Sequence, residues 1–157
     1  MEVRIFTDGS SLGNPGPGGF GIVMLFGTRR KEISKGFKKT TNNRMELMAV
    51  LVALELLKSN KYNIHIFSDS KYVIDSISKG WVYNWQKKNF KGKKNKDLWL
   101  KYLRVAKGFN VRYTWVKGHA GNIENERCDV MAVQAAETGP WVEDEGYEQE
   151  NSSGMFD

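Results

Sequence analysis

The sequence predicts an α/β fold built on a five-stranded mixed sheet, with three antiparallel strands followed by two parallel strands and flanked by helices. Three β-rich runs, at residues 2–7, 19–26 and 30–37, come first and are separated by turn-forming residues, which predicts an antiparallel meander. Residues 43–58 then form a long helical pattern that is apolar on almost every side. Because this helix leads into a further strand at 64–68, a right-handed crossover would place that strand parallel to the first.

The remaining elements complete one domain. The pattern predicts the last strand of the sheet at 111–116 and helices near residues 70–78, 96–107 and 123–137. We expect residues 1–139 to form a single domain, from which a basic segment at about 80–96 protrudes. Residues 140–157 are expected to form an acidic, partly disordered tail.

The charge distribution indicates the class of partner. The chain has 157 residues, with 24 Lys and Arg against 18 Asp and Glu, for a net charge of +6. Six of the acids and none of the bases lie in residues 140–157, so residues 1–139 carry 24 bases against 12 acids, or +12. A body this basic favours nucleic acid or an anionic membrane surface. The chain has neither an apolar run of the ~18 residues that span a membrane nor an N-terminal signal segment, which favours nucleic acid.

The cysteine content indicates the compartment. Cys128 is the single cysteine and can form no internal disulfide, which favours a reducing cytoplasm. Nothing in the sequence indicates an obligate protein partner, so we expect a cytoplasmic monomer.

Four acids where elements change, Asp8, Glu46, Asp69 and Asp129, predict a metal site. Asp8 follows the run Val3–Thr7 and Asp69 follows Ile64–Ser68, so both read as aspartates at the carboxyl ends of neighbouring parallel strands, where α/β sheets bind ligands. Glu46 lies about one turn into the helix that joins these strands. Taken alone it reads as an acid favoured by the helix dipole, but the crossover carries it towards the two aspartates. Carboxylates that share a cavity repel unless a cation neutralises them, and oxygen ligands select hard ions such as Mg²⁺ or Mn²⁺.

Blocks of residues along nearly the whole chain resemble, in order, the motifs of type 1 ribonuclease H. They are Thr7-Asp8-Gly9-Ser10, Gly13-Asn14-Pro15-Gly16-Pro17-Gly18-Gly19, Asn42-Asn43-Arg44-Met45-Glu46, Ser68-Asp69-Ser70, Trp115-Val116-Lys117-Gly118-His119-Ala120-Gly121 and Asn125-Glu126-Arg127-Cys128-Asp129. The resemblance implies a ribonuclease H-like fold and an endoribonuclease that hydrolyses the RNA strand of RNA–DNA hybrids. It also implies that the metal ligands are Asp8, Glu46, Asp69 and Asp129, and that His119 assists catalysis from a mobile loop.

The implied mechanism suits these residue types. Two Mg²⁺ ions about 4 Å apart, for which Mn²⁺ can substitute, activate a water and stabilise the leaving 3′ oxygen. Cleavage would leave 5′-phosphate and 3′-hydroxyl ends. An imidazole that titrates near neutrality suits His119 to proton transfer or product release.

The same resemblance assigns residues to the two strands of the hybrid. The residues that it implies contact the RNA 2′-hydroxyls, which distinguish RNA from DNA, are Gly9, Ser11, Asn14, Asn43 and Glu46. A pocket for a DNA phosphate falls to Thr41, Asn95 and Trp99, with Asn42 on the DNA side and Ser70 and Lys71 along the groove. The protrusion, where lysines and aromatics are interleaved, grips the DNA through Trp81, Trp85, Lys87, Lys88 and Lys91.

Other interpretations fit the sequence less well. The glycine-rich residues 13–19 would cradle a nucleotide phosphate only if a helix followed, and a strand-like run follows instead, so they are read as a tight turn. The alternative function is a non-catalytic RNA–DNA hybrid-binding module of the same fold, which predicts loss of at least one acid. Transposase or integrase relatives would not carry Asn42–Glu46 or Lys117–Gly121, and a proofreading exonuclease would carry a glutamate at Ser10.

Overall fold

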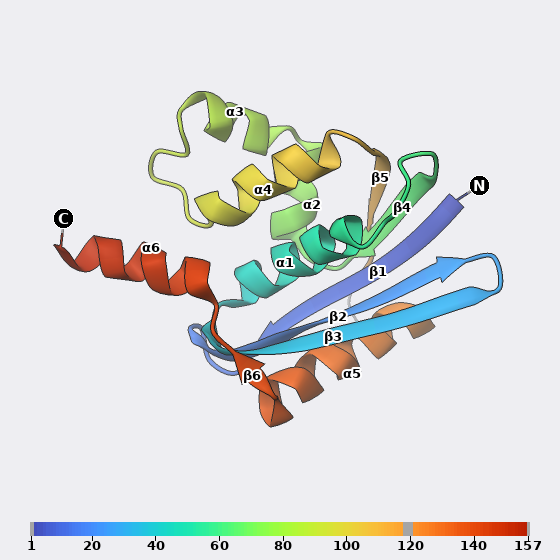
Figure 1. Cartoon of the computed structure of the whole chain (residues 1–157), viewed down its shortest axis with the longest axis horizontal. Coiled ribbons are helices and arrows are strands. Elements are labelled where there is room, and N and C mark those ends of the chain that lie inside the picture. Colours follow the sequence, from blue (N-terminus) through green and yellow to red (C-terminus); the bar gives the residue numbers. More distant parts are fainter. Residues whose placement is uncertain (1, 118–120, 157) are drawn as a thin grey trace.

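A six-stranded mixed sheet forms the centre of the molecule, with α5 on one face and the helices α1 to α4 on the other (Figure 1). The computed structural model describes residues 2–117 and 121–156. The strand order is β5-β4-β1-β2-β3-β6. The strands are β1 (Glu2–Ser11), β2 (Gly16–Phe26), β3 (Arg29–Thr40), β4 (Asn63–Ser68), β5 (Asn110–Trp115) and β6 (Trp141–Val142). The helices are α1 (Asn42–Glu55), α2 (Lys71–Ser78), α3 (Trp81–Lys87), α4 (Lys96–Ala106), α5 (Ile123–Thr138) and α6 (Glu145–Phe156).

The pairing of the first five strands confirms the topology expected from the sequence. β1, β2 and β3 pair antiparallel in series, and β4 and β5 extend the sheet in parallel beyond β1. The expected total of five strands is wrong, because β6 adds a sixth that pairs in parallel with β3 through Gly36 and Phe37. With only two residues, β6 has no periodicity to read, and its pairing depends on a partner more than 100 positions away.

Strand β1 runs further than its apolar run suggested. Its parallel pairing with β4 ends at Thr7 and Ser68, but its antiparallel pairing with β2 continues to Ser11 and Gly18. Asp8 therefore lies inside a strand rather than at its end, just past the point where β4 stops. Asp8 still lies at the edge of the sheet where β4 ends, next to the last residue pair of β1 and β4.

Close packing of α5 on the sheet explains several glycines. A Cβ atom on Gly19 would lie 2.7 Å from the carbonyl oxygen of Ala132, and one on Gly21 would lie 2.4 Å from that of Cys128. The turn that the sequence predicted over residues 13–19 is shorter in the structure, because β2 already begins at Gly16. The later glycines let a helix approach the strand backbone.

Helix α1 occupies the centre of the other face. The Thr41 hydroxyl caps its start by accepting a hydrogen bond from the Arg44 N–H at 3.3 Å. Its apolar side chains join those of the sheet in the main core, whose fully buried members include Ile5, Ile22, Met45, Leu47, Leu54 and Ile66. This packing, apolar on nearly all sides, fixes α1 and therefore the position of its first turns, which carry Glu46.

The acidic C-terminal segment, expected to be partly disordered, forms β6 and α6 in the structure. Buried Arg44 explains the attachment, because a guanidinium out of water needs counter-charges. The guanidinium donates two hydrogen bonds to Asp144, at 2.8 and 2.9 Å, and two more to Asp97, both at 2.8 Å. Asp144 also accepts from the Thr40 hydroxyl. Across the described residues, no helix combines the length and apolarity needed to cross a bilayer.

Candidate functional site

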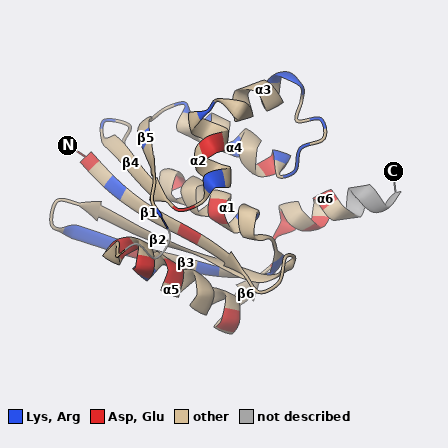
Figure 2. Ribbon diagram, turned by 180° about the vertical axis from the view of Figure 1, so that it is seen from behind, with Lys and Arg blue, Asp and Glu red and all other residues tan. Residues whose placement is uncertain are grey.

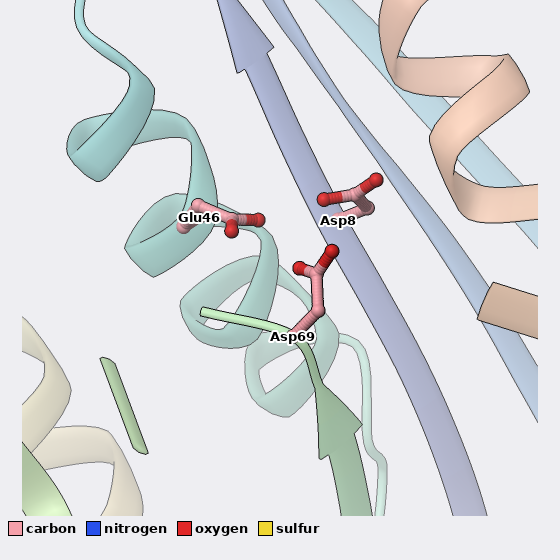
Figure 3. A group of neighbouring side chains, drawn as sticks. All are labelled: Asp8, Glu46 and Asp69. Atoms are coloured by element: carbon pink, nitrogen blue, oxygen red, sulfur yellow. The ribbon is translucent and has the colours of Figure 1, made fainter. Parts of the chain in front are cut away.

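Three carboxylates from three elements converge at one end of the sheet. Asp8 comes from β1, Glu46 from α1 and Asp69 from the residue after β4, and Figure 3 shows their oxygens directed at one another. One oxygen from each lies within 4.8 Å of the others. The crossover of α1 produces this arrangement, as the sequence predicted, because it sets β4 beside β1 with Thr7 opposite Ser68.

Gly9 allows the helix to approach the strand closely enough for this cluster to form. A Cβ atom at Gly9 would lie 2.4 Å from the Glu46 backbone nitrogen and 2.8 Å from the Met45 Cβ. Any side chain at Gly9 would therefore push the first turn of α1 away from β1. The glycine also donates its N–H to Asp8 Oδ1 at 2.9 Å, which orients that carboxylate.

Burial and mutual repulsion hold protons on this cluster. Asp8 is 7% exposed and Glu46 5% exposed. Burial, followed by the nearby charges of Asp69 and Asp129, raises the pKa of Asp8 to about 8. Burial, followed by the charges of Asp8 and Asp69, raises the pKa of Glu46 well above its usual range. Among the described residues, Glu46 Oε1 and Asp69 Oδ1 are buried without a hydrogen-bond partner. A divalent cation with oxygen ligands fits such a donor set.

The other two residues expected at the catalytic centre, Asp129 and His119, are not part of this three-carboxylate cluster in the described structure. Asp129, in α5, is half-buried and close enough for its charge to raise the pKa of Asp8. Its carboxylate is nevertheless not among the three whose oxygens lie within 4.8 Å of one another. His119 lies outside the described residues.

The backbone at Asp69 is held by neighbours whose role the sequence did not reveal. The Trp115 indole N–H donates to the Asp69 carbonyl oxygen at 3.0 Å. The Val116 N–H donates to the Ser68 carbonyl oxygen at 2.9 Å, and the Ser68 hydroxyl accepts from the Ser70 N–H. Trp115 lies in a motif block, but nothing local to it shows that β5 ends beside Asp69. These contacts hold the backbone of Asp69, which lies between β4 and α2, and thereby position its carboxylate.

A cavity of about 720 Å³, lined in part by Asn43 from the first turn of α1 and Tyr72 from α2, gathers much of the expected substrate surface. Six of the residues that the resemblance assigned to substrate line it, namely Asn14, Thr41, Asn43, Trp81, Trp85 and Asn95. Lys93 and Lys94 add positive charge to the same wall. The structure also places part of α6 there, through Tyr147, Glu150 and Asn151, which the expectation of a disordered tail had left out.

Trp99 does not lie where the sequence interpretation put it. It is fully buried, and its indole N–H donates to the Tyr72 hydroxyl at 2.8 Å. The Trp85 ring meets it edge to face, with ring centroids 6.1 Å apart. Three aromatic side chains, Tyr72, Trp85 and Tyr102, pack around Trp99 and keep it from the surface. Trp99 therefore supports two residues that line the cavity, Tyr72 and Trp85, and is not exposed to a phosphate.

The remaining expected substrate residues surround the cluster and the cavity. Ser11 ends β1, and the Asn42 N–H donates to Asn14 Oδ1 at 2.9 Å. Ser70 caps α2 by accepting from the Val73 N–H, and the ammonium of Lys71 lies 4.7 Å from the Trp115 ring centroid. Figure 2 shows basic residues from the end of α3 through the segment that follows it. The exposed lysines there include Lys87, Lys88 and Lys91.

A buried cluster of carboxylates beside a basic, aromatic-lined cavity defines a metal-dependent enzyme that acts on nucleic acid. The family model described as RNase H matches residues 1–137. The chain belongs to the ribonuclease H family.

Individual relatives agree with this assignment. The chain is 51% identical over 140 residues to Ribonuclease H from Desulforamulus reducens, a match that covers 86% of this chain and 87% of the relative. It is 47% identical over 152 residues to Ribonuclease H from Trichodesmium erythraeum, with 94% and 96% covered. Both matches confirm the family that the motif blocks indicated.

Solved structures agree on the fold. LC9-RNase H1, a type 1 RNase H with the type 2 active-site motif, matches with a TM-score of 0.78 and 30% identity over 94% of this chain and 80% of that one. LC11-RNase H1, solved in complex with an RNA/DNA hybrid, matches with a TM-score of 0.66 and 21% identity over 86% and 96%. At 21% identity, the similarity to LC11-RNase H1 shows a shared fold and no more. Apart from the sixth strand, the expected fold is confirmed.

Proposed function

We propose that this chain is a metal-dependent endoribonuclease that hydrolyses the RNA strand of RNA–DNA hybrids, leaving 5′-phosphate and 3′-hydroxyl ends. The observation that carries the proposal is the convergence of Asp8, Glu46 and Asp69 in a chain of the ribonuclease H family. The relatives share the name Ribonuclease H over most of their length. A cavity lined by basic and aromatic side chains is shared by α2, α3 and the residues at the start of α1, the helix that carries Glu46.

The cluster suits divalent metal. Asp8, Glu46 and Asp69 would hold Mg²⁺, two ions per site when substrate is present, with Asp129 approaching as a further ligand; Mn²⁺ can substitute. Bound ions supply an acidified water and positive charge for the leaving 3′ oxygen. The unpartnered oxygens of Glu46 and Asp69 and the raised pKa of Asp8 support this assignment, because each is relieved by a cation.

The protein's own residues orient the substrate. Backbone and side-chain groups of Gly9, Ser11, Asn14 and Asn43, with Glu46, would contact the RNA strand and its 2′-hydroxyls. The DNA strand would lie along Thr41, Asn42 and Asn95, past Ser70 and Lys71, towards Trp81, Trp85, Lys87, Lys88 and Lys91. The cavity that unites six of these residues supports this path.

His119 would move a proton or assist product release, since imidazole is the side chain best suited to proton transfer at physiological pH. We further propose a cytoplasmic monomer without an obligate partner. The single cysteine, which is buried and unpaired, suits a reducing compartment.

One assay tests the function against its alternative. Labelled RNA–DNA hybrid, duplex RNA and duplex DNA are each incubated with the protein in Mg²⁺ or in a chelator. We expect cleavage of the RNA strand of the hybrid alone, and only in Mg²⁺. Asp69→Asn, which keeps the shape of the side chain, should bind hybrid without cutting it. Binding without cleavage by the unaltered chain would establish the non-catalytic hybrid-binding module instead.

A further inference from the structure

Helix α6 brings negative charge to a cavity that is otherwise suited to an anion. Residues 140–157 contain six acids and no Lys or Arg, and Figure 2 shows acidic and no basic colouring on the described part of α6. Three residues of this helix, Tyr147, Glu150 and Asn151, line the same cavity as Lys93, Lys94 and four of the expected DNA-strand residues, which are Thr41, Trp81, Trp85 and Asn95. The protein therefore places its own acidic segment on its proposed substrate surface.

The contact is specific to one carboxylate and one backbone amide. Glu150 Oε1 accepts a hydrogen bond from the Asn95 backbone N–H at 3.3 Å. The Asn95 side chain is already engaged, since its Oδ1 accepts from Arg44 at 3.4 Å and its Nδ2 donates to the Tyr72 hydroxyl at 3.1 Å. Glu150 thus occupies the backbone N–H of Asn95, and a carboxylate oxygen accepts from it as a phosphate oxygen would.

Glu150 is held weakly enough to leave. Its other oxygen, Oε2, lies 3.9 Å from Arg44 Nη1, whereas Asp97 and Asp144 bind the same guanidinium at 2.8 Å. One positive charge therefore faces three carboxylates, and Glu150 is the most distant of them, with a side chain that is 37% exposed. At 3.9 Å, and with two closer carboxylates already neutralising Arg44, this contact holds Glu150 less firmly than Asp97 or Asp144 is held, so a phosphate of higher charge can displace it.

We propose that Glu150 determines the affinity for the DNA strand, with α6 acting as an internal competitor that occupies the Asn95 phosphate site until substrate displaces it. The proposal rests on the substrate path described under the proposed function. Its consequence is that the apparent affinity for hybrid is reduced by the fraction of molecules in which α6 is docked. Competition of this kind selects for long, multiply charged duplexes, which displace the helix, over short or single phosphates, which do not.

The test compares two substitutions in the full-length protein. Glu150→Ala and Glu148→Ala remove the same side chain and the same charge from α6, and Glu148 is exposed and does not line the cavity. We expect Glu150→Ala to lower the KM for hybrid about three- to ten-fold with kcat nearly unchanged. Glu148→Ala should stay within about two-fold of the unaltered protein, and the gap between the variants should narrow as salt screens the charges. Equal KM values for the two variants, or a raised KM for Glu150→Ala, would overturn the proposal.

A second measurement does not depend on catalysis. The amide resonance of Asn95 is followed by NMR while inorganic phosphate is added. We expect it to shift at lower phosphate concentration in Glu150→Ala than in Glu148→Ala, and identical titrations would overturn the proposal. If the unaltered chain failed to cut hybrid, the proposed function would fail, and this titration would still decide whether α6 occupies an anion site.

Discussion

Replacing Asp8 by Asn should stabilise the metal-free protein while abolishing its activity. The native pKa of Asp8 is about 8, against 3.8 in the unfolded chain. The native state therefore holds a proton that the unfolded state releases, and this group makes stability fall as pH rises from 3.8 to about 8. Each unit is worth about 1.4 kcal/mol, which sets an upper limit of about 4 kcal/mol at pH 7. Because side-chain relaxation and the shared charges of the cluster reduce that figure, we expect a gain of about 2 kcal/mol.

Asparagine suits this experiment because it keeps the shape of Asp8 and the oxygen that accepts from Gly9. Thermal melts in a chelator should show Asp8→Asn melting roughly 4–8 °C above the unaltered protein at pH 8. The difference should shrink towards zero near pH 3, below the unfolded pKa of 3.8, where Asp8 is largely protonated in both states. Adding Mg²⁺ should raise the melting temperature of the unaltered protein more than that of the variant. A gain that did not grow with pH would refute the reasoning from burial and repulsion.

Three further predictions concern the supports of the site. Trp115→Phe removes the N–H that holds the Asp69 carbonyl; we expect kcat to fall about five-fold and half-maximal activity to need more Mg²⁺, with KM for hybrid nearly unchanged. An unaltered Mg²⁺ requirement would argue against this positioning role. Arg44→Ala leaves buried Asp144 without its partner and should lower the free energy of unfolding in urea by roughly 3–5 kcal/mol. Lys38→Ala, from an exposed pair with 62% and 63% accessible side chains, is the control and should cost under about 1 kcal/mol. Replacing four exposed lysines of the protrusion together by Ala, namely Lys87, Lys88, Lys91 and Lys94, should raise the KM for hybrid. The slope of log affinity against log salt concentration should flatten by ~0.9 for each phosphate that is no longer neutralised. An unchanged slope would show that other residues bind the DNA strand.

The cluster of Asp8, Glu46 and Asp69 was accessible from sequence because each step of the argument is local or follows a general rule. Alternating apolar residues predict strands, the apolar pattern of residues 43–58 predicts a helix, and handedness places the strand after that helix parallel to the first. Aspartates after neighbouring parallel strands then meet. The same reasoning could not place Trp115 against Asp69, since that contact depends on how far β5 extends beside β4.

The sequence by itself determined the order of the first five strands, the central helix, the meeting of three acids, and the family to which the motifs belong. Only the tertiary structure decided the course of residues 140–156, the burial of Trp99 and the length of β1. The physical reason is common to all three. Each depends on contacts with another element, which no local pattern shows: Arg44 and Asn95 for α6, the rings of Tyr72 and Trp85 for Trp99, and the pairing with β2 for the end of β1. Composition marks the C-terminal segment as acidic, but a buried guanidinium and a backbone N–H elsewhere in the fold give that charge a place to bind.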